Sequence, residues 1–196
     1  MSKMKTRMGK ATSRLFIGIP PCGSTQAYFD ELIRRCRARI EQQQRNQIHW
    51  TRPHDRHLTL GFLGETPDYL IPSIEQGLVQ IAGTVSRASG HLFSLTPFPA
   101  QNAHLLAAEL TGDPNLQKLH QLCQQLIIHL GMTPGRRSYR PHITLARGRE
   151  GFCGLVPVHL DYSMPLNTIA LYKSIPAPDS SHYQRLFETA LCGIPL

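Results

Sequence analysis

Two short stretches with the same pattern are the best candidates for chemistry in this chain. Residues 57–60 and 142–145 are HLTL and HITL. In a β-strand, successive side chains point to opposite faces, so His and Thr would share one face and the two aliphatic residues the other. Each stretch therefore predicts an imidazole beside a hydroxyl on a cleft-facing surface, with aliphatic side chains behind them in a core.

These side chains suit the cleavage of a phosphodiester. An imidazole has an unperturbed pKa of about 6.5, so near neutral pH one histidine can accept a proton while another donates one. His57 and His142 are the candidate acid–base pair, in roles that the symmetric pattern does not assign. Thr59 and Thr144 would donate hydrogen bonds to the non-bridging phosphate oxygens. This chemistry needs no metal ion and no cofactor.

Two arginines flank the second stretch and are candidate phosphate ligands. Arg140 lies just before His142, and Arg147 lies two residues beyond Leu145. Arg147 stands at an odd offset from His142, so a regular strand would place it on the opposite face. A bend at the strand end would return it to the cleft, and the alternative is a surface arginine at the end of a strand.

The repetition of the pattern favours catalysis over a chance match. A single HxTL would be weak evidence in a chain with 10 His, but both copies follow basic residues and both continue as strand-like sequence. An alternative is a non-catalytic RNA-binding module with a phosphate-holding cleft. A metal hydrolase is disfavoured because the chain has no HxH or HExxH, and His54 with His57 lacks a third partner at usable spacing. No GxSxG supports a serine hydrolase.

Composition limits the classes of protein further. The 196 residues are 41% hydrophobic and 17% charged, and no apolar run approaches the length of a membrane span. Five scattered cysteines without a CxxC predict free thiols in a reducing compartment, so we expect a cytoplasmic protein. The net charge of +8 favours a polyanionic partner such as nucleic acid, the alternative being a merely basic surface.

Periodicity predicts alternating strands and helices around the two stretches. Helical spacing is found at 25–40, at 66–81 with Thr66 as N-cap, and at 116–130 with Gly131 as C-cap. The strand candidates, besides the two His-Thr stretches, are residues 15–19, 47–51, 91–96, 104–110, 156–161 and 166–173. Residues 182–191 are ambiguous between strand and helix. We predict an α+β fold, with a flexible basic tail at 1–13 and one domain of two lobes at 14–196.

Four ordered motifs together resemble a known family. They are RLFI at 14–17, HLTLGFLGE at 57–65, RPHITLAR at 140–147 and LYKS at 171–174. This set resembles the 2H phosphoesterase superfamily, and more narrowly the bacterial RNA 2′,3′-cyclic phosphodiesterases, historically called 2′-5′ RNA ligases. The chain departs from the family in a longer basic extension before Arg14 and in the polar segment 42–47, neither of which touches the motifs.

The resemblance implies a bilobal α+β fold, with two antiparallel sheets lining a central cleft, helices on the outside and residues 182–191 as a strand. It implies metal-independent opening of RNA 2′,3′-cyclic phosphate ends to 2′-phosphomonoesters, with 2′-5′ RNA ligase activity as a second activity to test. His142 would be the proton acceptor and His57 the proton donor, with Arg147 as a phosphate ligand. The expected partners are RNA with 2′,3′-cyclic phosphate ends or small cyclic nucleotides. We expect the protein to be a monomer that does not associate with a membrane.

Overall fold

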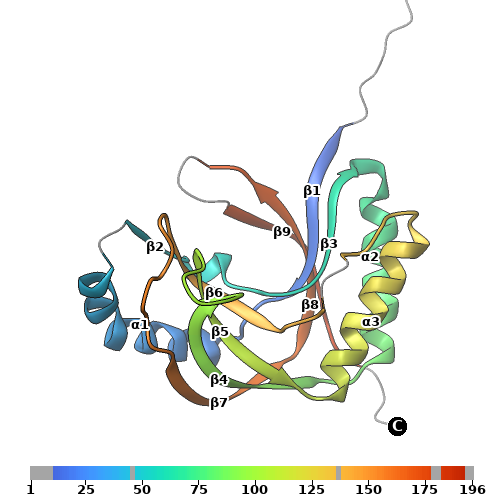
Figure 1. Cartoon of the computed structure of the whole chain (residues 1–196). Coiled ribbons are helices and arrows are strands. Elements are labelled where there is room, and N and C mark those ends of the chain that lie inside the picture. Colours follow the sequence, from blue (N-terminus) through green and yellow to red (C-terminus); the bar gives the residue numbers. More distant parts are fainter. Residues whose placement is uncertain (1–10, 45–46, 136–137, 178–181, 193–196) are drawn as a thin grey trace, which may run out of the picture.

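A large antiparallel sheet with helices on its outside forms the protein (Figure 1). The computed structural model describes residues 11–44, 47–135, 138–177 and 182–192. Its strands are β1 (Thr12–Ile19), β2 (Ile48–Trp50), β3 (Leu58–Pro67), β4 (Ala88–Phe98), β5 (Leu105–Gly112), β6 (His142–Gly148), β7 (Val158–Leu166), β8 (Thr168–Ile175) and β9 (His182–Ala190). The helices are α1 (Gly23–Gln43), α2 (Ile71–Thr84) and α3 (Pro114–His129), with short 3₁₀ turns η1 (Pro53–Asp55) and η2 (Asp68–Leu70).

The sheet divides into two halves that meet at β6 and β3. The strand order is β7-β4-β5-β6-β3-β1-β8-β9, with β2 added to β6. Within the described chain, β3 and β6 share a single register pair, Leu58 with Ile143, whereas β2 pairs with β6 further along, at residues 146–148. The α+β class is therefore confirmed, and the two predicted sheets are the two halves of one continuous sheet.

The aliphatic residues of the two HxTL stretches lie in the core, as predicted. Leu58, Leu60, Ile143 and Leu145 are all at most 1% exposed. They join one hydrophobic cluster that includes Leu15, Ile17 and Ile19 of β1 and the apolar faces of the three helices. Burying these side chains on one face of each strand leaves His and Thr on the other face.

The helices cover the sheet from two sides (Figure 1). α1 follows the predicted stripe, burying Phe29, Ile33, Cys36 and Ile40, and the ring of its Tyr28 stacks on Tyr162 of β7 at 4.1 Å. α2 packs against β8 and β9, and α3 packs against α2 and against β3, β4 and β5. Gly131 takes a φ of 77° just after α3, as expected of a C-cap glycine.

The structure corrects one predicted helix start and settles the ambiguous tail. Thr66 does not cap a helix, because β3 continues to Pro67 and Thr66 pairs with Ser13 of β1. α2 begins later, at Ile71, with a proline in its first turn. Residues 182–190 form β9, the strand implied by the family resemblance.

The predicted tail at 1–13 is described only in part. Residues 1–10 lie outside the described residues, and Thr12 already pairs with Pro67 in the sheet. None of the helices within the described residues has the length and apolar character required to cross a bilayer.

Candidate active site

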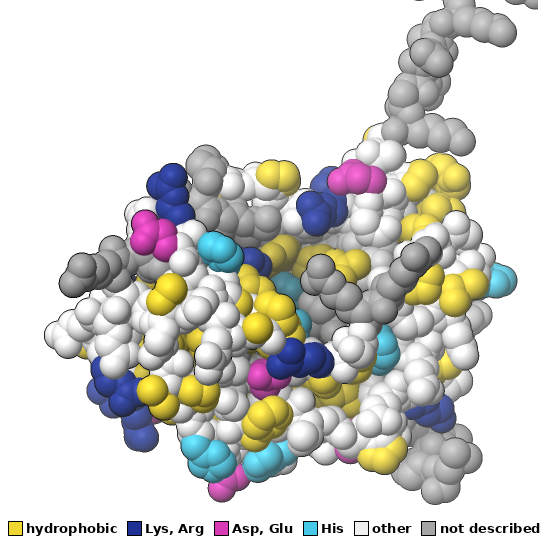
Figure 2. Space-filling model, in the orientation of Figure 1, with side chains coloured by type: hydrophobic (Ala, Val, Ile, Leu, Met, Phe, Trp, Pro, Cys, Tyr) yellow, Lys and Arg dark blue, Asp and Glu magenta, His cyan; other side chains and the backbone are white. Residues whose placement is uncertain are grey.

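A cleft of about 1090 Å³ lies between the two halves of the sheet, and the predicted side chains line it. His57, Thr59, His142, Thr144 and Arg147 are all in its walls, so five of the six predicted site residues come together. Figure 2 shows the hollow near the centre of one face, with histidine, basic and hydrophobic side chains gathered around it.

The join between β3 and β6 places the two histidines and the two threonines around one point. In an antiparallel pair, one step forward along one strand matches one step back along the other. Leu58 pairs with Ile143, and extending this register by one residue in each direction sets Thr59 opposite His142 and His57 opposite Thr144. Along their strands the four polar side chains alternate with buried aliphatic residues such as Leu58 and Ile143, so they share the face that lines the cleft.

Both imidazoles are held in the same way by the backbone. The Nδ1 of His57 lies 2.8 Å from the carbonyl oxygen of Asp55, and the Nδ1 of His142 lies 2.8 Å from that of Arg140. A carbonyl can only accept, so each Nδ1 carries a hydrogen and donates it. In the neutral ring Nε2 is then the unprotonated nitrogen, available to exchange a proton with a ligand in the cleft.

Burial lowers the pKa of both histidines. Desolvation brings the pKa of His57 to about 4, although the Asp55 carbonyl opposes the shift, and the nearby charges of Arg147 and His142 lower it further. The pKa of His142 is also lowered, mainly by burial, with Arg140 and Arg147 adding to the effect and Glu109 opposing it. Arg147 therefore acts on both imidazoles, which agrees with its place in the cleft.

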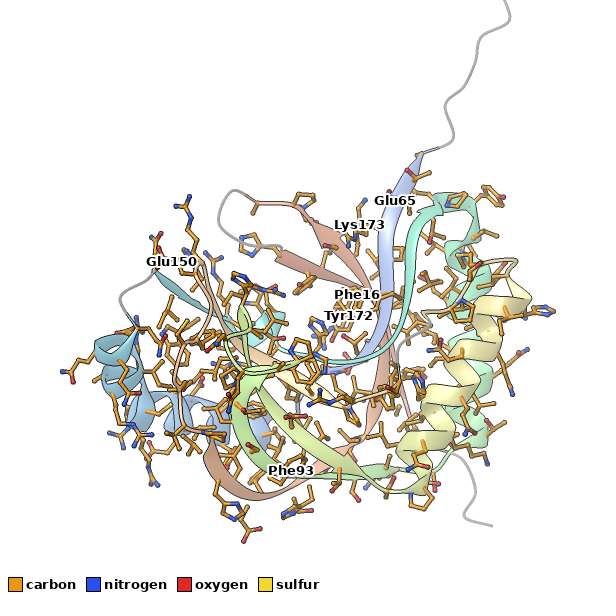
Figure 3. The ribbon with its side chains drawn as sticks, viewed as in Figure 1. Phe16, Glu65, Phe93, Glu150, Tyr172 and Lys173 are labelled. Atoms are coloured by element: carbon orange, nitrogen blue, oxygen red, sulfur yellow. The ribbon has the colours of Figure 1, made fainter. Side chains whose placement is uncertain are left out.

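Aromatic rings support each histidine. Phe16 of β1 packs on His57 with ring centres 4.6 Å apart, and Tyr183 of β9 meets the same imidazole edge-on at 4.7 Å. Phe16 in turn stacks on Tyr172 of β8 at 4.9 Å, two residues that lie side by side in Figure 3. On the other half, Phe98 stacks on His142 at 3.9 Å. These contacts restrict the orientation of both imidazole rings.

A β-bulge in β6 brings Arg147 to the cleft. Leu106 pairs with Ala146 and Ala107 pairs with Thr144, so Leu145 is the extra residue. Its carbonyl accepts a hydrogen bond of 2.8 Å from the backbone N–H of Thr51. Leu145 and Ala146 are consecutively buried, and Arg147 returns to the face of His142. The bend proposed from the sequence is present, and its form is this bulge.

A similar β-bulge in β3 brings Phe62 to the cleft. Ile17 pairs with Gly61 and Gly18 pairs with Thr59, so Leu60 is the extra residue. The Leu60 carbonyl accepts hydrogen bonds from His120 Nδ1 at 2.8 Å and from Gln124 Nε2 at 2.9 Å, both on α3. Phe62 follows the bulge, is 64% exposed and lines the cleft.

Arg140, the sixth predicted site residue, is engaged in contacts with the protein. Its Nη2 lies 2.8 Å from Glu109 Oε2, its Nη1 donates to the Pro99 carbonyl at 2.8 Å, and its guanidinium lies over the Phe98 ring at 4.6 Å. It is not among the residues that line the cleft. Within the described residues the guanidinium of Arg147 makes no hydrogen bond or ion pair, while its backbone pairs with Leu105 and His49. Of the two predicted arginines, Arg147 thus presents an uncommitted guanidinium to the cleft, whereas Arg140 contacts Phe98 and holds His142 through its carbonyl.

The residues that sequence reasoning missed reach the cleft through long-range pairing. Phe62 stands five residues after His57, as Arg147 does after His142, and that shared spacing was a signal that could have identified it. Arg14, Arg37 and Arg52 also line the cleft and add positive charge to its walls. Tyr183, which packs on His57, comes from the last strand and gave no local signal.

Comparison with known proteins gives a consistent result. The family model described as the 2′-5′ RNA ligase superfamily matches residues 21–151. An RNA 2′,3′-cyclic phosphodiesterase of Bacillus subtilis (strain 168) is 29% identical over 147 residues, which are 72% of this chain and 80% of that protein.

Solved structures share the fold. TT0787 of Thermus thermophilus has a TM-score of 0.79 at 24% identity, covering 92% of this chain and 98% of its own. LigT of Escherichia coli complexed with 3′-AMP has a TM-score of 0.69 at 23% identity, covering 92% and 99%.

Proposed function

The chain belongs to the 2′-5′ RNA ligase superfamily, and from this premise we propose that it hydrolyses RNA 2′,3′-cyclic phosphate ends to 2′-phosphomonoesters. The observation that carries the proposal is the arrangement at the β3–β6 join. Two imidazoles with unprotonated Nε2 atoms and two hydroxyls share one face of one cleft. The relatives named RNA 2′,3′-cyclic phosphodiesterase support this choice of substrate.

The reaction divides its two proton transfers between the two halves of the sheet. We assign His142 as the base that takes a proton from water as the water oxygen bonds to phosphorus. His57 is the acid that gives a proton to O3′ as the bond from phosphorus to O3′ breaks. The products are a 2′-phosphate and a 3′-hydroxyl. Each transfer contributes about 10²–10⁴-fold to the rate.

The lowered pKa of His57 bears on this assignment. At a pKa of about 4 the imidazole is neutral at pH 7 in the free protein. The negative charge of a bound phosphate favours the imidazolium form and raises the pKa, so the donor takes up its proton as the substrate binds. The pKa of free His57 alone would suit a base equally well, which is why the assignment needs its own test.

The phosphate is held by Thr59, Thr144 and Arg147. The threonine hydroxyls lie across from the two imidazoles and donate hydrogen bonds to the non-bridging oxygens. Arg147, which is not committed to any described carboxylate, supplies the positive charge. Phe62 offers an exposed ring in the same cleft on which the terminal nucleobase stacks.

The same geometry accommodates ligation. If the 5′-hydroxyl of a second RNA replaces water, its oxygen bonds to phosphorus, the bond to O3′ breaks, and a 2′-5′ linkage results. Arg14, Arg37 and Arg52 line the cleft and would attract the phosphates of either RNA. Small cyclic nucleotides, which present the same ring, are substrates as well.

The test is an assay on an RNA ending in a 2′,3′-cyclic phosphate, with the phosphomonoester identified by its resistance to a phosphatase specific for 3′-phosphates. We expect a 2′-phosphate, which is still formed after treatment with a chelator, because the imidazoles perform both proton transfers. Binding of the RNA without turnover would instead favour a non-catalytic RNA-binding module. A 3′-phosphate product would mean that O2′, and not O3′, is the leaving oxygen.

A further inference from the structure

Three potential metal ligands from distant parts of the chain meet at the edge of the cleft. His54 and Asp55 lie in η1, and His182 is the first residue of β9. One ligand atom from each, His54 Nε2, Asp55 Oδ2 and His182 Nδ1, lies within 4.8 Å of the other two. Asp55 and His182 also line the cleft, whereas His54 faces solvent.

Two of the three separations match the edges of a coordination polyhedron, and one of them, from His182 Nδ1 to Asp55 Oδ2, is also within hydrogen-bonding distance. Asp55 Oδ2 lies 3.4 Å from His54 Nε2 and 3.3 Å from His182 Nδ1. Charge-assisted hydrogen bonds are shorter, about 2.7–2.9 Å. In a tetrahedral zinc site with bonds of about 2.0–2.1 Å to nitrogen and oxygen, neighbouring ligand atoms stand roughly 3.3–3.4 Å apart.

The carboxylate is buried and already oriented. The Asp55 side chain is 5% exposed, and within the described residues no lysine or arginine pairs with it. Its Oδ1 accepts a hydrogen bond of 2.9 Å from the backbone N–H of Tyr183, which turns Oδ2 toward the two imidazoles. A buried carboxylate requires a compensating positive charge. A divalent cation between the three side chains would provide it, and the Tyr183 N–H is the kind of outer contact that orients a metal ligand.

We propose that His54, Asp55 and His182 form a binding site for Zn²⁺ that joins η1 to β9. Two imidazole nitrogens and one carboxylate oxygen suit zinc, whereas Mg²⁺ and Ca²⁺ prefer oxygen ligands. A water molecule completes the tetrahedron. The site is structural: it fixes Asp55, whose backbone carbonyl holds His57, and it keeps Tyr183 against the same imidazole. The proton transfers do not pass through it.

The experiment is a calorimetric titration of ZnCl₂ into the full chain without a histidine tag, after chelator treatment. We expect one Zn²⁺ per chain, and at least about 10-fold weaker binding in His54→Ala and in His182→Ala. His91→Ala is the matched control, because His91 Nε2 lies 3.5 Å from Asp161 Oδ1 and no third ligand joins this pair among the described residues. Absent binding, or binding that both ligand variants retain, would overturn the site.

A second measurement shows whether a lost signal comes from a lost ligand or from a lost fold. At Zn²⁺ 100-fold above its Kd, the ratio of folded to unfolded wild-type chain should rise about 100-fold, seen as a higher thermal midpoint. His54→Ala and His182→Ala should match the metal-free wild type in circular dichroism and gain no such rise. An equal rise in both variants would refute the assignment. This outcome is independent of whether the cleft turns over cyclic phosphates.

Discussion

Phe62 and Arg147 occupy equivalent places in the two halves of the sheet. Each stands five residues after its histidine, each follows a one-residue bulge, and each lines the cleft. The two HxTL motifs match in their imidazoles and hydroxyls but differ here, with an aromatic ring on one side and a cation on the other. Because of this difference, the two sides of a nearly symmetric cleft are chemically distinct.

Both histidines are expected to be needed for turnover. His57→Ala and His142→Ala should each lower kcat on a mononucleotide 2′,3′-cyclic phosphate by about 10²–10⁴-fold, because each removes one proton transfer. His91→Ala, on β4 and outside the cleft, is the control and should keep its activity. If either cleft variant remained folded and fully active, paired catalysis would be wrong.

A sulfur-substituted substrate separates the acid from the base. Sulfur in place of the 3′-bridging oxygen leaves without a proton, so the acid becomes dispensable while the attacking water still needs its base. The 3′-thio cyclic substrate should largely restore turnover of His57→Ala and leave His142→Ala slow. Restoration of His142→Ala would exchange the two roles. Restoration of neither variant would indicate that the imidazoles chiefly hold the phosphate.

Arg147 and Arg140 are expected to differ in what their loss affects. Arg147→Ala should slow turnover even on a mononucleotide and reduce the salt dependence of RNA binding by about one unit of slope, since one phosphate contact is lost. Arg140→Ala should leave that slope unchanged, because its guanidinium contacts Glu109 and Pro99. Equal slopes for Arg147→Ala and the wild type would remove Arg147 from the phosphate site.

Phe62 is expected to act through the nucleobase. Phe62→Ala should weaken binding of a cyclic nucleotide by about 1–3 kcal/mol if the base stacks on the ring, and Phe62→Tyr should restore most of it. A substrate that lacks a base, ribose 2′,3′-cyclic phosphate, is the control and should respond little to either change. An equal loss on this substrate would show that Phe62 shapes the cleft instead.

Acid should destabilise the fold through His57. Its folded pKa of about 4 is below the unfolded value of about 6.5, so between these limits the unfolded chain binds more protons. Stability is therefore lost as the pH falls through this window and is unaffected above it. From pH 7 to pH 4 the loss amounts to about 3 kcal/mol. Urea unfolding of wild type and His57→Asn at both pH values measures it: the variant should lack this part of the loss.

The sequence was sufficient for features with local causes. The HxTL alternation predicted two strands with buried Leu58, Leu60, Ile143 and Leu145, and the helical stripe of α1 was predicted almost residue for residue. Both signals arise from the period of a single element, which depends only on neighbours along the chain.

Features that depend on pairing between distant strands could not be predicted. Simple alternation would place Arg147 and Phe62 outside the cleft, and the bulges that reverse this are stabilised by Thr51 and by α3. Substrate binding by Arg140 stays a prediction, and the ion pair of its guanidinium with Glu109 on β5 had no signal in the local sequence. A local pattern identifies residues whose side chains could bind or react with a substrate. Contacts with distant parts of the chain determine which way those side chains point.

The single register pair between β3 and β6 also makes the candidate site depend on contacts between distant parts of the chain. His57 and His142 lie far apart along the chain, so the join forms by closing a long loop, a step with a high entropic barrier. Hairpin-like pairings such as β4 with β5 and β8 with β9 close much shorter loops. The β1–β8 pairing in the second half closes a still longer loop, between Leu15 and Lys173, so the arrangement of the two imidazoles depends on long-range pairing on both sides of the join.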